Sequence, residues 1–354
     1  MSNYNILTGQ ILALANQFGF LEANVAQIKI DKSVLANFAE WLNKKFHGEM
    51  TYLERNTGLR FNPEQLYSDT LSIICVKMPY LTNKIAYHQQ RAADPMLANI
   101  SSYAMGRDYH KVVKKQLKLY ADAINSLLSQ QSQKIKYRCF TDSAPILEIE
   151  LAVSAGLGWK GKNTLLLHKQ EGSMFFLGEL FINLPLTTSS PSKNHCGSCT
   201  KCLTICPTNA FVEPYVLDAK RCISYLTIEN KGAIPVEYRK AIGNRIYGCD
   251  ECQLVCPWNK FSQLTSLTDF NIRHSLDKLS LINAFTMDET LWRNKMQGSP
   301  ILRIGYEAWL RNVAVALGNT ITTAEVIKVL QSKLNYPSAI VREHVQWALQ
   351  QHIS

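Results

Sequence analysis

Eight of the ten cysteines in this chain fall into groups whose spacing is typical of metal-cluster ligands. The first group has the spacing C-x2-C-x2-C-x3-C-P, the second reads C-x2-C-x3-C-P, and one cysteine lies alone between them. This spacing is the bacterial ferredoxin signature of [4Fe–4S] clusters, which transfer single electrons. Eight thiolates make two sets of four, so the sequence predicts two clusters. The eight are Cys196, Cys199, Cys202, Cys206, Cys222, Cys249, Cys252 and Cys256.

The order of these cysteines also predicts how they divide between the two clusters. Three closely spaced thiolates cap three corners of one cubane, and in two-cluster ferredoxins the fourth cysteine of the run ligates the other cluster. Two zinc sites are the alternative, but zinc does not explain two runs that end in Cys-Pro. Disulfides are disfavoured because the cysteines group by ligand spacing. The predicted sets are Cys196, Cys199, Cys202 and Cys256 for one cluster, and Cys206, Cys222, Cys249 and Cys252 for the other.

The chain has 354 residues, enough for two or three domains, and carries a formal net charge of +10 with a pI of about 9.0. Two clusters of about −2 each would leave about +6, so the excess of positive charge survives cofactor binding. Such a charge favours a polyanionic partner such as nucleic acid, although many basic proteins bind none. The sequence shows neither an export signal nor an apolar stretch of membrane-spanning length, so we expect a cytoplasmic protein.

Hydrophobic periodicity predicts an α+β fold for the part of the chain that precedes the cysteines. Residues 1–60 favour helices, and residues 107–131 favour one long basic helix. Residues 70–79 are rich in β-branched side chains and end at a proline, which predicts a buried strand with Cys75 in the core. A second strand is expected at residues 134–140.

A turn-rich segment at residues 189–195 is typical of a linker into the cysteine-rich module. Helices are predicted beyond that module, and two of them carry a similar apolar pattern around an arginine. Such helices are typical of HEAT-type repeats, which stack into a concave surface, although a plain helical cap is the alternative. The predicted helices cover residues 301–317, 324–334 and 338–349. The predicted domains are residues 1–190, 191–270 and 271–354.

Two short motifs match cofactor signatures only weakly. Residues 156–161 read G-x-G-x-x-G, but the predicted helix precedes them and the strand follows, which is the reverse of a dinucleotide-binding unit. Asn163 stands where a phosphate loop needs a hydroxyl, so a glycine-rich turn is the simpler interpretation. Asp108-Tyr-His110 begins like the D-x-H-x-x-G motif of cobalamin proteins, but Val113 replaces the glycine. We therefore expect His110 to be a helix residue or a hydrogen-bonding partner and not a cobalt ligand.

Several longer stretches occur together with the two cysteine runs. They are HGEMTYLER at 47–55, YAMGRDYH at 103–110, FTDSAPILE at 140–148, GLGWKGKNTLLL at 156–167, CISYLTIE at 222–229 and RNVAVALGN at 311–319. In this combination the chain resembles the epoxyqueuosine reductase family over nearly its whole length. The resemblance implies a cobalamin-binding α+β domain of the nitroreductase type, a ferredoxin-like two-cluster module and a HEAT-like helical domain. It also implies reduction of epoxyqueuosine to queuosine at the wobble position of tRNA, with cobalamin and two [4Fe–4S] clusters as cofactors.

The same resemblance implies particular site residues. It assigns the proton donor for the departing epoxide oxygen to Asp142, which would act near neutral pH only if burial raised its pKa. A turn or helix cap is the alternative for Asp142, and a surface charge at a helix end is the alternative for Arg60. The implied cobalamin contacts are Arg60, Met105, Asp142, Lys160, Ser224 and Asp250. The implied tRNA contacts are Tyr225, Lys231, Arg303, Arg311 and Arg342.

Two other functions fit part of the pattern. A reductive dehalogenase also joins a cobalamin domain to two ferredoxin-type clusters, but such enzymes usually carry a twin-arginine export signal, which this sequence does not show. A plain electron-transfer subunit would not need the 190 residues that precede the clusters. We therefore expect an oxidoreductase that acts as a monomer on tRNA, has no membrane partner, and receives electrons from an external carrier of the flavodoxin or ferredoxin type.

Overall fold

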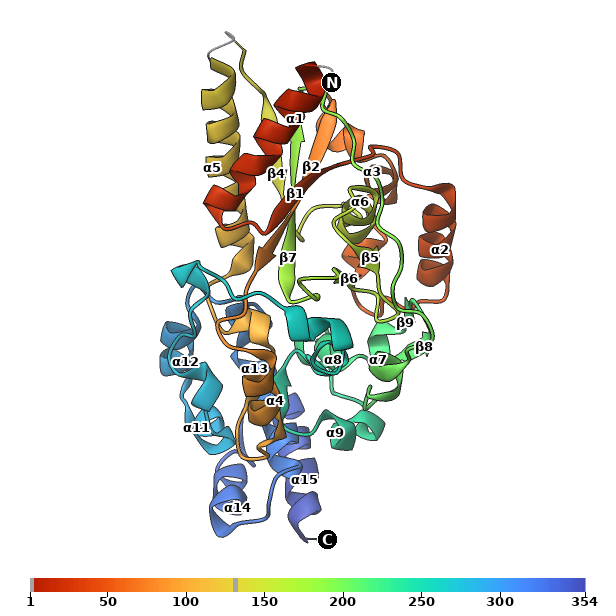
Figure 1. Cartoon of the computed structure of the whole chain (residues 1–354). Coiled ribbons are helices and arrows are strands. Elements are labelled where there is room, and N and C mark those ends of the chain that lie inside the picture. The colour runs from red at the N-terminus through yellow and green to blue at the C-terminus, as the bar shows by residue number, and fades with distance from the viewer. Residues whose placement is uncertain (1–2, 130–132, 354) are drawn as a thin grey trace.

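The computed structural model describes residues 3–129 and 133–353. Its central element is an antiparallel sheet with the strand order β1-β2-β7-β4 (Figure 1). β2 and β7 pair along their full length, and every residue of β2 is buried because helices cover both faces of the sheet. The four strands are β1 (Glu22–Ala26), β2 (Ser72–Pro79), β7 (Phe175–Ile182) and β4 (Tyr137–Phe140).

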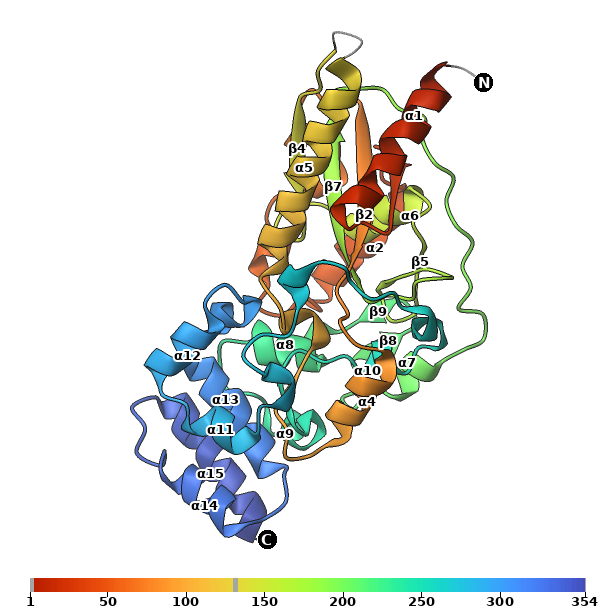
Figure 2. The ribbon, with the colours of Figure 1, turned by 60° about the vertical axis from the view of Figure 1, so that its left-hand side comes forward.

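Helices α1 (Asn3–Leu14) and α5 (Tyr109–Ser129) cover one face of the sheet, and α6 (Glu148–Ser154) covers the other (Figures 1 and 2). α5 buries apolar side chains at helical spacing, Val113 and Leu117 among them, against β7. This packing fixes α5 along the sheet and leaves its lysine-rich face outward. On the α6 side, Cys75 is packed in the core as predicted.

Short elements surround the cysteines and extend from the sheet. A stretch without regular helix or strand, residues 183–200, leads from β7 into this region. Helices α7 (Lys201–Thr204) and α10 (Glu251–Leu254) contact each other there. The other elements are the hairpins β5 (Trp159–Lys160) with β6 (Leu166–Leu167) and β8 (Phe211–Glu213) with β9 (Val216–Leu217), and helices α2 (Lys32–Asn43), α3 (Thr57–Phe61), α8 (Ile223–Ile228) and α9 (Val236–Ile242).

The last part of the chain is helical and has its own apolar core. Helix α13 is buried along most of its length and packs against α15, and Trp292 and Trp309 lie at the centre of this core. Figure 1 shows this group at the opposite end of the molecule from α1. The helices are α11 (Leu281–Thr286), α12 (Glu289–Met296), α13 (Gly305–Gly318), α14 (Ala324–Gln331) and α15 (Ala339–Ile353).

One early segment packs with this late core and not with the sheet. Strand β3 (Asn99–Ile100) pairs in parallel with β10 (Arg245–Tyr247), and α4 (Ile85–Ala93) contacts α10 (Figure 2). Ile100 and Met105 share the apolar core of the C-terminal helices. The predicted unit of residues 1–190 is therefore not one continuous packing unit, since hydrophobic periodicity does not indicate which distant core an apolar segment joins.

Most of the long predicted elements are confirmed. The strand predicted at 70–79 is β2, and the helix predicted at 107–131 is α5 as far as Ser129, with residues 130–131 outside the described part of the chain. The prediction of helices alone in residues 1–60 is wrong at β1, whose alternation of polar and apolar residues is that of a half-buried edge strand. Within residues 3–129 and 133–353, no helix has both the length and the apolarity that a membrane crossing requires.

The glycine-rich stretch is a turn between α6 and β5, as predicted. Gly156 has a φ of 76°, in the left-handed region that glycine tolerates. A Cβ atom at this position would lie 2.2 Å from the Ser190 carbonyl oxygen. The glycine thus allows close approach of the chain's own backbone, and no dinucleotide motif is needed to explain it.

Candidate active site

Four cysteines from distant segments line one small cavity of about 50 Å³. Three belong to the loop before α7 and to α7 itself, and the fourth follows α10. Burial and the neighbouring thiols of Cys256, Cys196 and Cys199 raise the pKa of Cys202 to about 11. Cys199 is exposed, so this group lies near the molecular surface. The structure therefore brings together the first set that the sequence predicts.

The other four cysteines gather deeper in the same region. Burial raises the pKa of Cys252, and Cys249 and Cys222 lie close enough to raise it further. Burial and the nearby Cys206 likewise raise the pKa of Cys222. These four are the second predicted set, and all eight thiols are free. Four thiol donors in each group match the four thiolates that a [4Fe–4S] cluster takes, so the residues fit two clusters.

Asp142 is the second residue of the loop after β4 and has a φ of 54°, an uncommon conformation for a residue other than glycine. Tyr109 Oη donates a hydrogen bond to its carboxylate, and His110 Nε2 lies 2.9 Å from its Oδ2. His110 Nδ1 lies 2.8 Å from Asp108 Oδ1, and Arg303 Nη2 donates to Asp108 Oδ2 at 2.9 Å. Arg303, Asp108, His110 and Asp142 therefore form one chain of alternating basic and acidic groups.

The charges in this chain place the proton on the histidine. Burial favours a raised pKa for Asp142, but hydrogen bonds from His110 and Tyr109 and the charge of His110 outweigh it, so the pKa of Asp142 lies below its usual value. Burial disfavours the charged form of His110, but Asp108 and Asp142 raise its pKa above the usual value. Burial alone would also raise the pKa of Asp108, yet hydrogen bonds from His110 and Arg303 lower it to about 2. The side chain of Asp142 is 52% exposed in this arrangement, so the condition that burial raise its pKa is not met by the protein alone.

Two further carboxyl groups lie behind the Asp142 loop. The backbone amide of Asp142 donates to Glu148 Oε1, at the start of α6, and Glu179 of β7 lies beside Glu148. Burial and the charge of Asp142 raise the pKa of Glu148 to about 7. Burial and the neighbouring Glu148 raise the pKa of Glu179 as well. The pair therefore retains a proton near neutral pH, and Glu148 fixes the backbone of Asp142.

Arg60 and Lys160, two implied cobalamin contacts, both have polar neighbours. Arg60 is 7% exposed, and its guanidinium donates to the carbonyl oxygens of Tyr52 and Ile146 at 3.4 Å each. Its Nε has no partner among the described residues, and the alternative of a surface helix-end charge is wrong for Arg60. Lys160 forms an ion pair with Glu150 at 2.9 Å while its side chain stays 38% exposed.

The other implied cobalamin contacts lie in three different surroundings. Ser224 is half-buried in the first turn of α8, where its backbone amide faces the Cys222 thiol. Met105 is 2% exposed and packs in the C-terminal core. Asp250 is 8% exposed and accepts hydrogen bonds from the backbone amide and hydroxyl of Ser102, both at 2.7 Å. In this conformation Met105 and Asp250 are engaged in the packing and hydrogen bonding of the fold itself.

Two of the implied tRNA contacts are interior residues. Arg311 is 1% exposed and donates to the carbonyl oxygens of Leu226, Asn230 and Gly232 at 2.7 to 3.0 Å. Burial lowers its pKa to about 10. Tyr225 is 7% exposed, and its hydroxyl accepts a backbone hydrogen bond. The structure argues against both as RNA contacts, because neither side chain reaches the surface.

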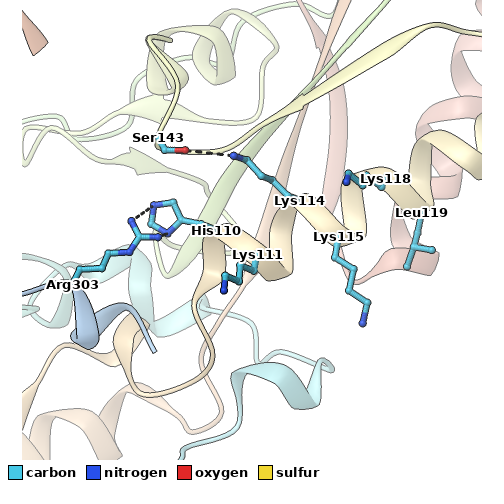
Figure 3. Close-up of a pocket in the computed structure, with 8 residues that line it drawn as sticks. All are labelled: His110, Lys111, Lys114, Lys115, Lys118, Leu119, Ser143 and Arg303. Atoms are coloured by element: carbon cyan, nitrogen blue, oxygen red, sulfur yellow. Dashed lines mark hydrogen bonds between the residues drawn. The ribbon is translucent and has the colours of Figure 1, made fainter. Parts of the chain in front are cut away.

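The remaining implied tRNA contacts are more open. Arg342 is half-buried and donates to the carbonyl oxygens of Tyr336 and Pro337 at 2.6 and 2.8 Å. Lys231 is exposed. Arg303 is 51% exposed and lies beside His110, as Figure 3 shows. Arg303 is therefore the one implied tRNA contact that the structure places in the Asp142 network.

Tyr109, Glu148 and Glu179 are site residues that sequence reasoning missed. His110, in contrast, was expected to be a helix residue or a hydrogen-bonding partner, and it is both. Tyr109 lies within the Asp108-Tyr-His110 motif, and Glu148 ends the FTDSAPILE stretch, so their sequence neighbourhood was a signal for both. Glu179 gave no such signal, because it stands in an otherwise apolar strand.

Two family models match parts of the chain. The model described as "Epoxyqueuosine reductase QueG" matches residues 60–143, which contain Asp108, His110 and Asp142. The model described as "4Fe-4S double cluster binding domain" matches residues 195–259, which contain all eight grouped cysteines. The first model thus covers the Asp108, His110 and Asp142 part of the network, and the second covers the cluster region.

Curated relatives and solved structures agree with these matches. The chain is 47% identical to the epoxyqueuosine reductase of Pseudomonas aeruginosa over 95% of this chain and 92% of that protein. It is 46% identical to the enzyme of the same name from Vibrio cholerae, over 99% and 93%. Its fold is similar to a crystal structure of epoxyqueuosine reductase with an epoxyqueuosine-modified tRNA-Tyr stem loop, with a TM-score of 0.85, 26% identity and coverage of 99% and 91%. On the identity and coverage of these relatives, the chain belongs to the epoxyqueuosine reductase family.

Proposed function

We propose that this chain reduces epoxyqueuosine to queuosine in tRNA, with electrons that pass through two [4Fe–4S] clusters. The similarity to curated epoxyqueuosine reductases extends over nearly the whole chain. The observation that carries the proposal is the presence in one chain of two four-cysteine groups and of an acid network at Asp142 and His110. Electron transfer alone would need only the cysteines, whereas epoxide reduction also needs a positioned proton donor.

The reaction sets what the protein has to supply. Conversion of an epoxide to an alkene breaks both C–O bonds, consumes two electrons and two protons, and releases the oxygen as water. Cobalamin, when bound, supplies a reduced cobalt centre that couples single electrons to the breaking of these bonds. The proposed ligands of the more exposed cluster are Cys196, Cys199, Cys202 and Cys256, and those of the inner cluster are Cys206, Cys222, Cys249 and Cys252.

We assign the binding of cobalamin first to Arg60, Lys160 and Ser224, together with Asp142. Arg60 fits a polar cofactor because its buried Nε has no partner in the described part of the chain. Lys160 fits because much of its side chain remains exposed although it pairs with Glu150. Met105 and Asp250 remain candidates only if the surrounding segments rearrange, since Met105 packs in the C-terminal core and both carboxylate oxygens of Asp250 already accept hydrogen bonds.

The acid network provides the proton for the departing oxygen. Asp108 orients the His110 ring through Nδ1 and stabilises its charged form, while Tyr109 fixes the Asp142 carboxylate. The oxygen of an opening epoxide becomes a stronger base than a carboxylate. A proton on His110 Nε2 therefore reaches that oxygen through Asp142, whose Oδ2 lies 2.9 Å away. Glu148 keeps Asp142 in place by accepting its backbone amide hydrogen bond.

We also propose the division of the chain into residues 1–190, 191–270 and 271–354, with a nitroreductase-type first part and a HEAT-like last part. The four-stranded sheet with helices on both faces supports the first assignment. The mutual packing of α13 and α15, the helices with similar apolar patterns, supports the last. The segment around α4 and β3 is the exception, because it packs with the later part.

The proposal includes an external electron carrier of the flavodoxin or ferredoxin type and a monomeric enzyme. The group that contains Cys199 would receive the electrons, because Cys199 is exposed whereas the other seven grouped cysteines are partly covered. The inner group would then pass them toward the substrate. The protein would meet its tRNA on the side of the molecule that carries the Asp142 loop.

The test is conversion by the complete holoprotein. The chain is purified without oxygen, its iron and cobalt are counted separately, and it is given a reductant and a stem loop that carries epoxyqueuosine. We expect the protein to contain the iron of two clusters and bound cobalt. The product nucleoside should be lighter than the substrate by one oxygen atom. A fully loaded protein that leaves the epoxide intact would contradict the proposed function.

A further inference from the structure

A hollow of about 600 Å³ opens on the outer face of α5, directly beside the Asp142 loop. At one end it is bounded by His110, Arg303 and Ser143, and Ser143 is the residue after Asp142. From there it continues along α5 over lysine side chains, as Figure 3 shows. The hollow thus connects the proposed catalytic acid with a basic helix face. The lysines that line it are Lys111, Lys114, Lys115 and Lys118.

The four lysines occupy one face of α5 by their spacing, which is i, i+3, i+4 and i+7. The opposite face, which includes Val113 and Leu117, is packed on the sheet, so the lysines stand on a fixed support. Lys114 Nζ lies 3.5 Å from Ser143 Oγ, and the other three side chains are exposed. In the part of the chain that the structure describes, none of the four is paired with an acidic side chain.

This arrangement is unfavourable for the protein on its own. Like charges at i and i+4 on a helix repel, and both Lys111–Lys115 and Lys114–Lys118 have this spacing. The row from Lys111 to Lys118 spans about 10 Å at about 1.5 Å per residue. Four cations within that distance match a ligand with several closely spaced negative charges, which a nucleic-acid backbone provides.

We propose that the lysine face of α5 binds the phosphate backbone of the tRNA anticodon arm next to the modified nucleotide. This inference rests on the proposed function, because the position of Asp142 decides which part of the RNA meets the hollow. A nucleotide whose base reaches Asp142 places its neighbouring phosphates beside Ser143 and Lys114, and the chain then continues along the row. Phosphate contacts of this kind fix the register of the RNA while the base contacts select it.

The position of the hollow favours RNA over an acidic protein. An electron carrier would have to approach the cysteine groups, whereas the hollow is lined by residues of the Asp142 network and of α5. The surface also replaces one that the sequence suggested, since Arg311 is buried and Arg342 donates to backbone carbonyls. Arg303 remains in contact with the hollow, but its guanidinium is held by Asp108.

Two full-length holoprotein variants with the same loss of charge test this assignment. The first replaces the α5 row (K111Q, K114Q, K115Q and K118Q). The control replaces four exposed lysines on other elements (K29Q, K32Q, K169Q and K240Q). Each lowers the formal net charge from +10 to +6. Affinity for an epoxyqueuosine stem loop is measured by fluorescence anisotropy over a series of salt concentrations.

The α5 variant should bind the stem loop at least about tenfold more weakly, and its salt dependence should flatten by about 0.7 in log–log slope for each phosphate that the row no longer neutralises. The control should keep most of the parent's affinity and slope. Equal affinity in the parent and the α5 variant, or an equal reduction in both variants, would overturn the proposal. Weakened binding only to an acidic electron carrier would also overturn it, because the partner would then be a protein.

Two additions keep the result interpretable. If the fourfold variant loses iron or cobalt, the double variant K111Q and K115Q is used, since both side chains are exposed and make no hydrogen bond in the described structure. The Lys→Arg form of the row should restore binding because it keeps the charge. A parent protein that binds the stem loop but never converts it would contradict the proposed function. If the parent converts the stem loop and the α5 variants bind it as tightly as the parent does, only this inference is contradicted.

Discussion

His110 Nε2 lies 2.9 Å from Asp142 Oδ2, so a residue of the first turn of α5 touches the loop that follows β4. The contact holds the two partners in opposite charge states, because the pKa of the histidine is raised and that of the aspartate is lowered. The proton donor of the reaction is therefore the His110–Asp142 pair and not Asp142 alone. Removal of either member should therefore slow the reaction.

His110→Gln should slow conversion of the epoxide by about 10² to 10⁴-fold, because it removes the proton that the pair holds. In the parent, the rate should fall as pH rises through the raised pKa of His110, since the ring then loses its proton. The groups that face the ring are Asp108, Asp142 and Arg303. Single-turnover rates between about pH 6 and pH 9 would measure this alkaline limb of the pH–rate profile, in which the rate falls.

Asp108→Asn tests independently whether His110 causes the fall in rate at high pH. The substitution removes an anion that raises the pKa of His110, so the fall in rate should move to lower pH. Asp69→Asn is the matched control, because Asp69 pairs with Lys136 at the surface and should leave the profile unchanged. An alkaline limb that stays in place in Asp108→Asn would show that His110 is not the titrating group.

Cys256→Ser should damage the same cluster as Cys199→Ser, because both thiols line one cavity although Cys256 follows Cys252 closely in sequence. Cys249→Ser should damage the other cluster, which it shares with Cys222. Iron counts and paramagnetic resonance spectra of the reduced variants would distinguish the two clusters. Grouping of Cys256 with Cys249 in these spectra would rule out the crossed sets.

Local spacing was enough to predict which cysteines come together, because a cluster fixes the distance between its ligands and so restricts how far apart they stand in the sequence. The exchange of Cys206 and Cys256 between the two sets needed one further argument, which is that three closely spaced cysteines bind one cluster and leave its fourth ligand to the other run. The Asp142 network is different. Asp108 and His110 are close in sequence, but their contacts with Asp142 and Arg303 depend on how α5, the β4 loop and the C-terminal segment pack.

Glu179→Gln should make the stability of the protein less sensitive to alkaline pH. The pKa of Glu148 is raised to about 7 in the fold, so its neutral form contributes stability that is complete below its usual pKa and is lost as pH rises through 7. The neighbouring Glu179 is also held neutral, by burial and by Glu148, so its replacement by Gln removes a second group that keeps a proton in the fold and loses it in the unfolded chain. The part of the parent's loss that comes from Glu148 should be on the order of 3 kcal/mol at most, at about 1.4 kcal/mol per pKa unit.

Thermal unfolding of the loaded protein at about pH 6 and pH 8 would measure the difference. The parent should lose more stability over this interval than Glu179→Gln does. Glu213→Gln, at an exposed position in β8, is the control and should behave as the parent. An equal loss in the parent and Glu179→Gln would mean that the Glu148–Glu179 pair is not protonated in the fold.

Arg311→Met should destabilise the protein on the order of 3 kcal/mol, because one buried and two partly buried carbonyl oxygens lose their donor. Arg293→Met, at an exposed position that pairs with Glu289, should change stability little. Thermal unfolding and the salt dependence of stem-loop binding would be measured together. If the Arg311→Met protein is as stable as the parent but binds RNA more weakly, Arg311 contacts the RNA and this account of its role is wrong.

Arg311 also shows why the RNA contacts were harder to predict than the clusters. It stands beside Asn312 in an apolar helix, and an arginine there either meets phosphate at the surface or satisfies buried carbonyls. Sequence does not distinguish the two, because the carbonyls come from residues 226–232, far away in the chain. The strands β1 and β7 were missed for a related reason, since their partners are distant and the edge strand is short.

Single-turnover conversion of an epoxyqueuosine stem loop by the parent and by Asp142→Asn is the most direct test of the account. Asn keeps the size and a hydrogen-bonding group but holds no transferable proton. With iron, cobalt and bound RNA equal in both proteins, the variant should convert the epoxide about 10² to 10⁴-fold more slowly. A rate within a few-fold of the parent would contradict the account, and Asp142 would then only shape the loop.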